Sequence, residues 1–520
     1  MASKTQSYIY DLLKIYTDSN LEANDFWVFC SDSTVAEKPV LTNSLSEMRH
    51  VLESAVFGKK VTGSDIEFMV FRNDWTVNAV YDEYSDEADL STKNFFVITE
   101  PESVGGLYEF FKCIDNNNGA VSMNKPISNS TINALGGLYR LNDGYLWKYL
   151  GSVTTEKFRK FSTNDKAPIT IETEVTDIAT DGIYKITVEN PSDNYGYERL
   201  TGTYTRKVAN SNRIIVNTDQ EFISNDGHYI GRTLIVTKTI GDSRQYTITG
   251  SLLSGADKIL EISGYNSADF LPAIGDSIQI LPRVAITGTG TGATAIAIFD
   301  DSNTKITGIR MVENGSGYKS ATVEIIDPVS FDSENENSMD TRVDAKPVIS
   351  PNGGHGANIV EELLSEAICM SVDISSLDPS VIPDNNTYAY ISLIKNPEFT
   401  SNTSVDSFDN RIKIELSTDL PEITVVGDTI TQIIDGVEIS GIIHEIEGTD
   451  TIFITDYDGP YSKEFTINES ITISGTSFDI NTIEESGYIS RTGEVLFINS
   501  TTPITRTPDN KEQIKFILSF

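Results

Sequence analysis

Glu-Gln-Ile-Lys-Phe-Ile-Leu-Ser-Phe, residues 512–520, alternates apolar and polar side chains. One set of alternate positions holds the apolar residues Ile514, Phe516, Leu518 and Phe520. The other set holds the polar residues Gln513, Lys515 and Ser519. Successive side chains of a β-strand point to opposite faces, so a period of two is typical of a strand with one face on a core. The sequence therefore predicts a strand at 512–520 that is paired within a sheet.

The same kind of pattern recurs along most of the chain. Short runs of Ile, Val, Thr, Tyr and Phe are separated by clusters of Gly, Asn, Asp and Ser. Turn signals at intervals of about 8–12 residues are typical of β-sandwiches and barrels. We therefore predict a mainly β protein, with a β-sandwich core and a few short helices.

Two helices are predicted against this β background. The first begins with a capping box of Ser44 and Glu47, and its apolar residues recur at helical spacing as far as Gly58: Leu45, Met48, Leu52 and Val56. The second is shorter, over 359–367, and follows the glycine-rich residues 353–356.

The length of 520 residues exceeds what one hydrophobic core supports, so about two to four folded units are expected. Two stretches share a short segment, Gly-Asp-Ser-Ile at 275–278 and Gly-Asp-Thr-Ile at 427–430. We interpret 199–283 and 409–484 as small β modules inserted into a larger core. That core has three parts: 1–198, 284–408 with glycine-rich hairpins, and 485–520 with the C-terminal strands.

The polar, acidic tract 327–344 is predicted to be a mobile surface loop.

The charge of the chain argues against two classes of partner. The sequence has 39 basic and 76 acidic residues, a formal net charge of −37. Such an excess repels the phosphates of nucleic acids and anionic lipids, so neither is expected as a partner. There is no apolar run of about 18 residues, and residues 1–18 lack the pattern of a signal peptide. The protein is therefore expected to stay in the compartment where it is made.

The motifs that usually carry chemistry lack their required context. The glycines of 288–293 match a dinucleotide fingerprint, but the residues that follow are typical of a strand and not of a helix. The four histidines (His50, His228, His355 and His444) form no zinc-binding pattern. The tract 115–119 has the wrong spacing for a calcium loop.

Three widely spaced cysteines, Cys30, Cys113 and Cys369, are expected as buried free thiols. The sequence predicts no catalytic residue, no cofactor and no metal.

The densest aromatic cluster is Asp-Gly-Tyr-Leu-Trp-Lys-Tyr-Leu at 143–150. If it is a strand, then Tyr145, Trp147 and Tyr149 share one face. Packing in a core or an interface is one interpretation, and an aromatic platform that binds sugars is the other.

Several short segments, in the order in which they occur along the chain, resemble segments of a known family: the baseplate wedge subunit known as gene product eight in T-even-type phages. The similar segments are Arg-Asn-Asp-Trp at 72–75, Phe-Lys-Cys-Ile-Asp at 111–115, the aromatic cluster at 143–150, Ile-Ser-Leu-Ile-Lys-Asn-Pro at 391–397, and the C-terminal stretches 493–499, 503–504 and 512–520. The stretches 199–283 and 409–484 look like additions that short members of that family lack.

This resemblance implies a β-sandwich-rich structural protein of the virion, assembled in the host cytoplasm. It implies a homodimer within each wedge that binds the other wedge proteins and helps to transmit the rearrangement that triggers sheath contraction. The candidate core or interface residues are Trp75, Cys113, Tyr145, Trp147, Tyr149, Asn396, Pro397, Phe516 and Phe520. Two alternatives stay open: a glycan-binding or glycan-cleaving tail spike, and a surface adhesin built from β modules.

Overall fold

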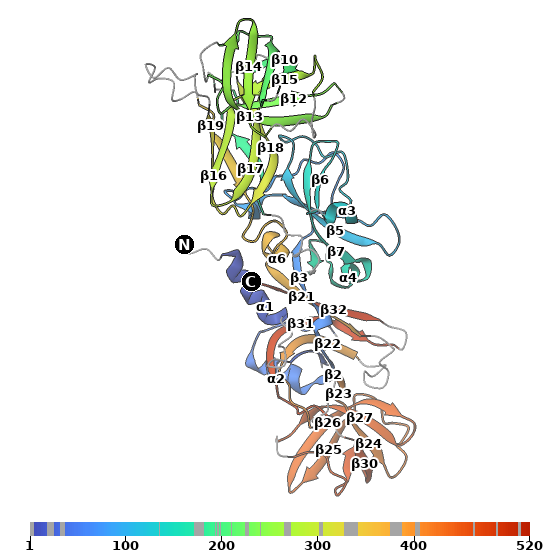
Figure 1. The fold of residues 1–520 in the computed structure, drawn as a ribbon. Helices are drawn as coiled ribbons and strands as arrows, with labels where there is room; N and C mark the ends of the chain where they lie inside the picture. The colour runs from blue at the N-terminus through green and yellow to red at the C-terminus, as the bar shows by residue number, and fades with distance from the viewer. Residues whose placement is uncertain are drawn as a thin grey trace. The chain divides into compact units, whose positions relative to one another are not determined.

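The computed structural model describes residues 5–17, 25–31, 37–134, 136–170, 181–192, 194, 197, 199–209, 211–223, 228–239, 241–264, 272–300, 305–326, 342–374, 387–400, 406–460, 463–484, 487–507 and 511–520. The fold is mainly β with few helices, so the predicted fold class is confirmed (Figure 1). The chain forms two compact units, each of which is described by itself. Most of the predicted loop 327–344 lies outside the described residues.

Unit 1 comprises Met1–Phe71, Glu156–Ile169 and Ser365–Phe520. Its first sheet has the order β23-β2-β1-β22-β31, built from Ser407–Asp409, Ala55–Lys60, Phe26–Ser31, Thr387–Lys395 and Glu494–Thr505. A four-stranded sheet has the order β32-β21-β3-β8, built from Glu512–Ser519, Ala367–Ile374, Ile66–Phe71 and Lys166–Ile169. The helices of this part are α1 (Gln6–Thr17), α2 (Leu45–Glu53), η2 (Gly63–Asp65) and α4 (Thr155–Phe161), which begins one residue before the boundary.

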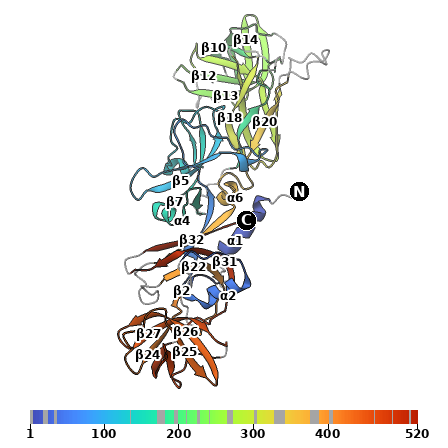
Figure 2. The same ribbon diagram turned by 180° about the vertical axis from the view of Figure 1, so that it is seen from behind.

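A seven-stranded sheet in unit 1 lies within the predicted module 409–484. Its order is β29-β28-β25-β26-β27-β24-β30, built from Thr476–Phe478, Ile471–Ile473, Thr429–Ile434, Val437–Glu447, Thr451–Asp458, Ile412–Leu416 and Ile480–Glu484. Figure 2 shows several of these strands grouped together in orange. They enclose a core of their own, which includes Ile414, Ile430, Ile443 and Ile471. We call residues 412–484 the C-terminal module.

Unit 2 comprises Arg72–Thr155 and Thr170–Leu364. Within 199–283, six strands close a barrel in the order β10-β11-β14-β13-β12-β15: Leu200–Lys207, Arg213–Thr218, Asp257–Ile262, Ser243–Ser254, Thr233–Thr237 and Ser277–Leu281. The barrel encloses its own apolar core, with Leu200, Tyr229, Ile248 and Ile280 among its members. Closure leaves this sheet without an unpaired edge.

Two further sheets complete unit 2. One has the order β19-β16-β17-β18-β9-β20, built from Ala321–Ile326, Arg283–Gly288, Thr291–Phe299, Ile306–Ser316, Ile183–Val188 and Ala345–Ile349. The other has the order β4-β5-β7-β6, built from Phe96–Thr99, Leu107–Asp115, Leu146–Thr154 and Leu138–Arg140. The short helices are η3 (Leu90–Thr92), α3 (Ser130–Asn133) and α6 (Ile359–Glu362).

The C-terminal strand β32 has the predicted alternation. Ile514 and Phe516 are buried, while Gln513 and Ser519 are exposed. The strand pairs with β21 along its whole length and is an edge of its sheet. The prediction of a paired strand at 512–520 is confirmed.

The helix predicted from Ser44 is α2, but it ends earlier than predicted. The Ser44 hydroxyl accepts a hydrogen bond from Glu47 N at 3.1 Å, and the Glu47 carboxylate accepts from Asn43 N at 2.7 Å. The extension to Gly58 was wrong, because β2 begins at Ala55. Residues of β2 pair with β1, with Phe57 opposite Cys30, so sheet pairing outweighs the helical spacing of the sequence.

The second predicted helix is also shorter than 359–367. Asn358 caps α6 through its side chain, and the helix ends at Glu362. Leu364 has a φ of 55°, which no helix continues, and Ala367 already pairs with strands on both sides.

Candidate functional site

Two of the predicted motifs are neighbours in the sheet β4-β5-β7-β6. Strands β5 and β7 are antiparallel, with Cys113 opposite Trp147 and Phe111 opposite Tyr149. Cys113 and Trp147 have no exposed surface. Burial raises the pKa of the Cys113 thiol well above its ordinary value, so the thiol is protonated and unreactive at neutral pH. These residues build the interior of the sheet.

The aromatic cluster is enclosed. The Tyr145 and Trp147 rings stack with centroids 5.4 Å apart, and Tyr81 meets Trp147 edge-on at 5.6 Å. The Tyr145 hydroxyl donates to Ala120 O at 2.6 Å. Tyr149 packs against Phe111 and is also buried. None of these three cluster rings, Tyr145, Trp147 and Tyr149, offers an open face to a ligand.

Trp75 lies at a partly exposed edge of unit 2. Its Nε1 donates to Ser122 Oγ at 3.1 Å. The segments on either side of this contact are hydrogen-bonded to each other, from Asn78 N to Ser122 O and from Ser122 N to Ala79 O, both at 2.8 Å. They carry exposed apolar side chains: Val77, Val80, Val121 and Met123. We call Trp75 with these four residues the Trp75 patch.

In unit 1, Asn396 and Pro397 form a turn after β22. Asn396 has a φ of 52°, its N donates to Asp25 O at 2.7 Å, and its Oδ1 accepts from Asp25 N at 2.8 Å. A Cβ at Gly493 would come within 3.3 Å of Pro397 Cα. The segments 391–397 and 493–499 therefore meet, and only glycine fits at the contact.

The other two candidates of unit 1 belong to the sheet of β32. Phe516 is buried and meets Phe497 edge-on at 5.6 Å. Phe520 is half-buried, with its ring 5.5 Å from that of Tyr16, and its N donates to Glu366 O at 3.0 Å. Both have packing roles.

A buried ionic cluster lies on the other face of β5 and β7, and the sequence predictions missed it. Lys112 and Lys148 are opposite each other in the register, and neither has exposed surface. Lys112 Nζ forms an ion pair with Glu362, whose other carboxylate oxygen accepts from Gly356 N at 2.7 Å. Lys148 Nζ donates to Gly136 O at 2.6 Å. A lysine inside an apolar run, as in Phe-Lys-Cys and Trp-Lys-Tyr, is the signal that indicates this burial.

His355 lies beside this cluster, fully buried between Tyr84 and Tyr184 at ring distances of 5.1 and 5.6 Å. Burial, followed by the charges of Lys112 and Lys148, holds its pKa well below the ordinary value, so the imidazole is neutral. Burial also lowers the pKa of Lys148 to about 8. The cluster ties the glycine-rich loop and α6 to the sheet.

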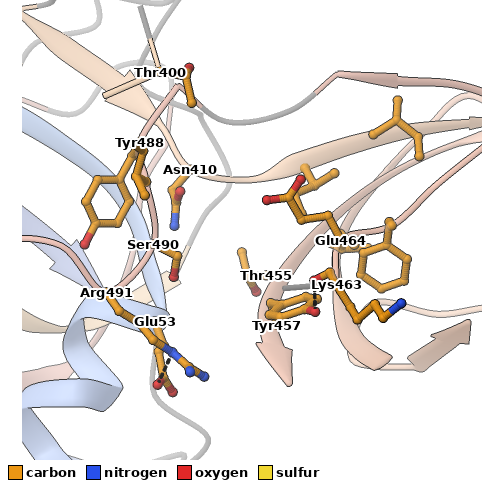
Figure 3. Close-up of a pocket in the computed structure, with 15 residues that line it drawn as sticks. Glu53, Thr400, Asn410, Thr455, Tyr457, Lys463, Glu464, Tyr488, Ser490 and Arg491 are labelled. Atoms are coloured by element: carbon orange, nitrogen blue, oxygen red, sulfur yellow. Dashed lines mark hydrogen bonds and ion pairs between the residues drawn. The ribbon is translucent and has the colours of Figure 1, made fainter. Parts of the chain in front are cut away.

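A cavity of about 410 Å³ lies in unit 1 (Figure 3). The C-terminal module supplies one wall, with Thr455 and Tyr457 on β27 and with Phe465. The other wall includes Asn410, outside the module, and Tyr488. None of these residues was predicted as a site from the sequence, because they come from four separate segments.

The aromatic rings of the cavity are held by neighbours. The Tyr488 hydroxyl donates to Thr492 O at 2.9 Å, and its ring stacks on Phe408 at 5.2 Å. The Tyr457 hydroxyl donates to Lys463 O, and its ring meets Phe465 edge-on at 6.1 Å. These contacts fix the rings without any ligand.

The polar groups of the cavity differ in how they are satisfied. Arg491 Nε pairs with Glu53 at 2.7 Å, and Lys463 pairs with Asp435. The Thr455 hydroxyl is buried and has no hydrogen-bond partner among the described residues. An unpaired buried hydroxyl costs free energy, so this group stands out within the cavity.

No group of three or more His, Cys, Asp or Glu side chains within the described part of the chain could hold a metal ion. Across the same residues, no helix has both the length and the apolar character that a membrane crossing requires. No protein-family model matches this chain, and no curated protein matches it.

Proposed function

We propose that this chain is a structural subunit of a phage tail baseplate wedge, where it forms a homodimer and binds neighbouring wedge proteins. The observation that supports this most is how the family-like segments pair. Segments 111–115 and 143–150 are adjacent strands, and so are 391–397 and 493–499. In each unit, two family-like segments thus lie side by side in one sheet, as expected if the resemblance reflects a shared framework.

The role of those residues is packing rather than chemistry. Trp147 and Phe516 are buried, and Asn396 shapes a turn. The two stretches that depart from the resemblance each close around their own apolar core, one as a barrel and one as the C-terminal module. A framework that carries self-contained modules suits a protein whose function is to hold other proteins in place.

The Trp75 patch is the surface that we propose for contact with a neighbouring wedge protein. Its exposed apolar side chains are carried by two segments that are hydrogen-bonded to each other, and a concentration of exposed apolar residues is typical of interaction sites. Trp75 adds a large aromatic residue of the kind that dominates binding energy at interfaces.

The test is affinity purification of the tagged full-length chain from the cells that produce it. We expect tail proteins to co-purify, and antibodies against the chain to label the baseplate end of tails in electron micrographs. Recovery of the chain alone, with no label on tail particles, would contradict the proposal.

A pair of variants tests the surface. Val80→Asp with Met123→Asp should abolish co-purification while the circular dichroism spectrum stays unchanged. Val104→Asp is the matched control, because Val104 is fully exposed elsewhere in unit 2. Equal loss with the control would show that the Trp75 patch is not the contact.

A further inference from the structure

We propose that the cavity of unit 1 binds a short, neutral carbohydrate. This proposal does not depend on the assembly role, because it rests on a different set of residues. The cavity has a volume of about 410 Å³. Sites for small molecules span about 300–1,000 Å³, so the space suits a ligand of disaccharide size.

The walls offer aromatic surface to such a ligand. Tyr457, Phe465 and Tyr488 line the space, and the contacts described above hold the rings of Tyr457 and Tyr488 in position. A sugar ring has apolar C–H faces that pack on aromatic rings, and hydroxyl groups around its rim. Rings fixed in advance lose little conformational entropy on binding.

The polar groups match the hydroxyl rim of a sugar. The Thr455 side chain is 8% exposed, and its Oγ1 has no partner among the described residues. A ligand hydroxyl would supply the missing hydrogen bond. Glu464 is exposed, and its carboxylate points into the cavity (Figure 3), where it can accept hydrogen bonds from ligand hydroxyls. Asn410 is fixed in the wall by its Nδ2, which donates to Ala55 O at 2.8 Å.

The charges around the cavity favour a neutral ligand. Arg491 is paired with Glu53, and Lys463 is paired with Asp435. The positive charges near the cavity are therefore already balanced by carboxylates, and an anionic ligand would be repelled by Glu464 and by the net charge of −37. A neutral sugar meets neither obstacle.

The direct test is isothermal titration calorimetry of the full chain with maltose, cellobiose and lactose in turn. We expect at least one of them to bind with a Kd of about 1 mM or tighter. The Kd should be the same in low and high sodium chloride, because the ligand is uncharged. Failure of all three sugars to bind would overturn the proposal, and so would affinity that falls steeply with salt.

Variants then assign the binding to this cavity. Tyr457→Ala and Glu464→Gln should each weaken binding at least about tenfold. Glu422→Gln is the control, because Glu422 is exposed on the same module but does not line the cavity. Glu464→Gln changes an exposed side chain, so it stays informative if Tyr457→Ala lowers the stability of the module. Unchanged affinity in Glu464→Gln would place the ligand elsewhere and refute the proposal.

Thr455→Val separates a binding role from a packing role. Valine keeps the shape of threonine and removes the unpaired hydroxyl, so the free protein should melt at a higher temperature. The same change should weaken sugar binding about tenfold, because the ligand loses its hydrogen bond. A higher melting temperature with unchanged affinity would show that Thr455 belongs only to the packing and takes no part in a site.

Discussion

Among single residues, Trp147 is a predicted candidate with no exposed surface, and its ring is stacked on Tyr145 and meets Tyr81 edge-on. Trp147→Ala should therefore lower the free energy of unfolding by about 3–5 kcal/mol, the range for deleting a large buried aromatic side chain. Urea unfolding followed by circular dichroism measures the change.

Trp75→Ala is the matched comparison for that experiment. Trp75 is only half-buried, so its loss should cost far less stability than the loss of Trp147. Equal effects of the two substitutions would contradict the assignment of Trp147 to the core and Trp75 to the surface.

His444, on β26 of the C-terminal module, makes the stability of that module depend on pH. Burial, followed by the charge of Arg411, lowers the pKa of His444 to about 4. In the unfolded chain the ordinary pKa is about 6.5, so between these values the unfolded state binds a proton that the folded state does not. Stability is therefore lost as the pH falls from about 6.5 to about 4, by up to about 3 kcal/mol.

Hydrogen exchange of peptides from β26, read by mass spectrometry, measures this loss. His444→Gln should flatten the pH dependence in that window, since glutamine does not titrate. A variant whose module loosens with acid as steeply as the unmodified protein would show that other groups cause the effect.

At the scale of elements, β2 depends on a glycine where two aromatic residues close in. A Cβ at Gly58 would lie 2.3 Å from Phe408 Cε1 and 2.8 Å from Phe29 Cδ1. Both rings are buried and have little room to move. Gly58→Ala should therefore cost about 1–3 kcal/mol of stability through overpacking.

Gly63→Ala provides the control for β2. No atom lies within 4 Å of a Cβ at Gly63, so this change should alter stability by less than about 0.5 kcal/mol. Thermal melts of the two variants under one set of conditions decide the comparison, and equal melting temperatures would count against the close approach at Gly58.

The elements show which parts of a fold local sequence can predict. The Ser44 cap and the alternation in β32 depend on neighbours within a few residues, and both were predicted correctly. The end of α2 was not, because Val56 fits the helical spacing of the sequence, whereas its neighbour Phe57 lies in β2 and pairs with Cys30 of β1. The sequence of this segment does not reveal whether helical spacing or strand pairing prevails, because that depends on a partner strand elsewhere in the chain.

The ionic cluster and the cavity were missed for a related reason. Lys112 pairs with Glu362, which is 250 residues away in the sequence. The cavity is lined by separate segments of unit 1 that share no sequence motif. The sequence indicated burial of the strands around Lys112 and Lys148, yet it gave no means to choose Glu362 among 76 acidic residues. Which residues meet in such a cluster or cavity can be determined only when the tertiary fold is known.

At the scale of the whole molecule, the C-terminal module should be removable. Within the described residues its strands pair in a sheet only with one another, and they enclose a separate core. The segments that precede and follow the module lie close to each other, since the Phe408 and Tyr488 rings stack with centroids 5.2 Å apart. A short Gly/Ser linker in place of 412–484 should close this gap at small entropic cost.

We expect the shortened chain to be soluble, with a β-type circular dichroism spectrum and the oligomeric state of the full chain by light scattering. Incorporation into tail particles should fall, because the module is then unavailable to partners. An insoluble product would show that the module and the rest of unit 1 form one cooperative core.

The division of the sequence between the two units has a consequence for synthesis. Unit 2 uses only residues between Arg72 and Leu364, whereas unit 1 needs β3, which precedes unit 2 in the sequence, and β32, which follows it. On the ribosome, unit 2 is complete while β21 still lacks the partner that arrives with Glu512–Ser519. Domains fold as units during translation, and pairings between distant segments form slowly. The sheet of β21 in unit 1 can therefore be completed only after Glu512–Ser519 has been synthesised, when all residues of unit 2 are already present.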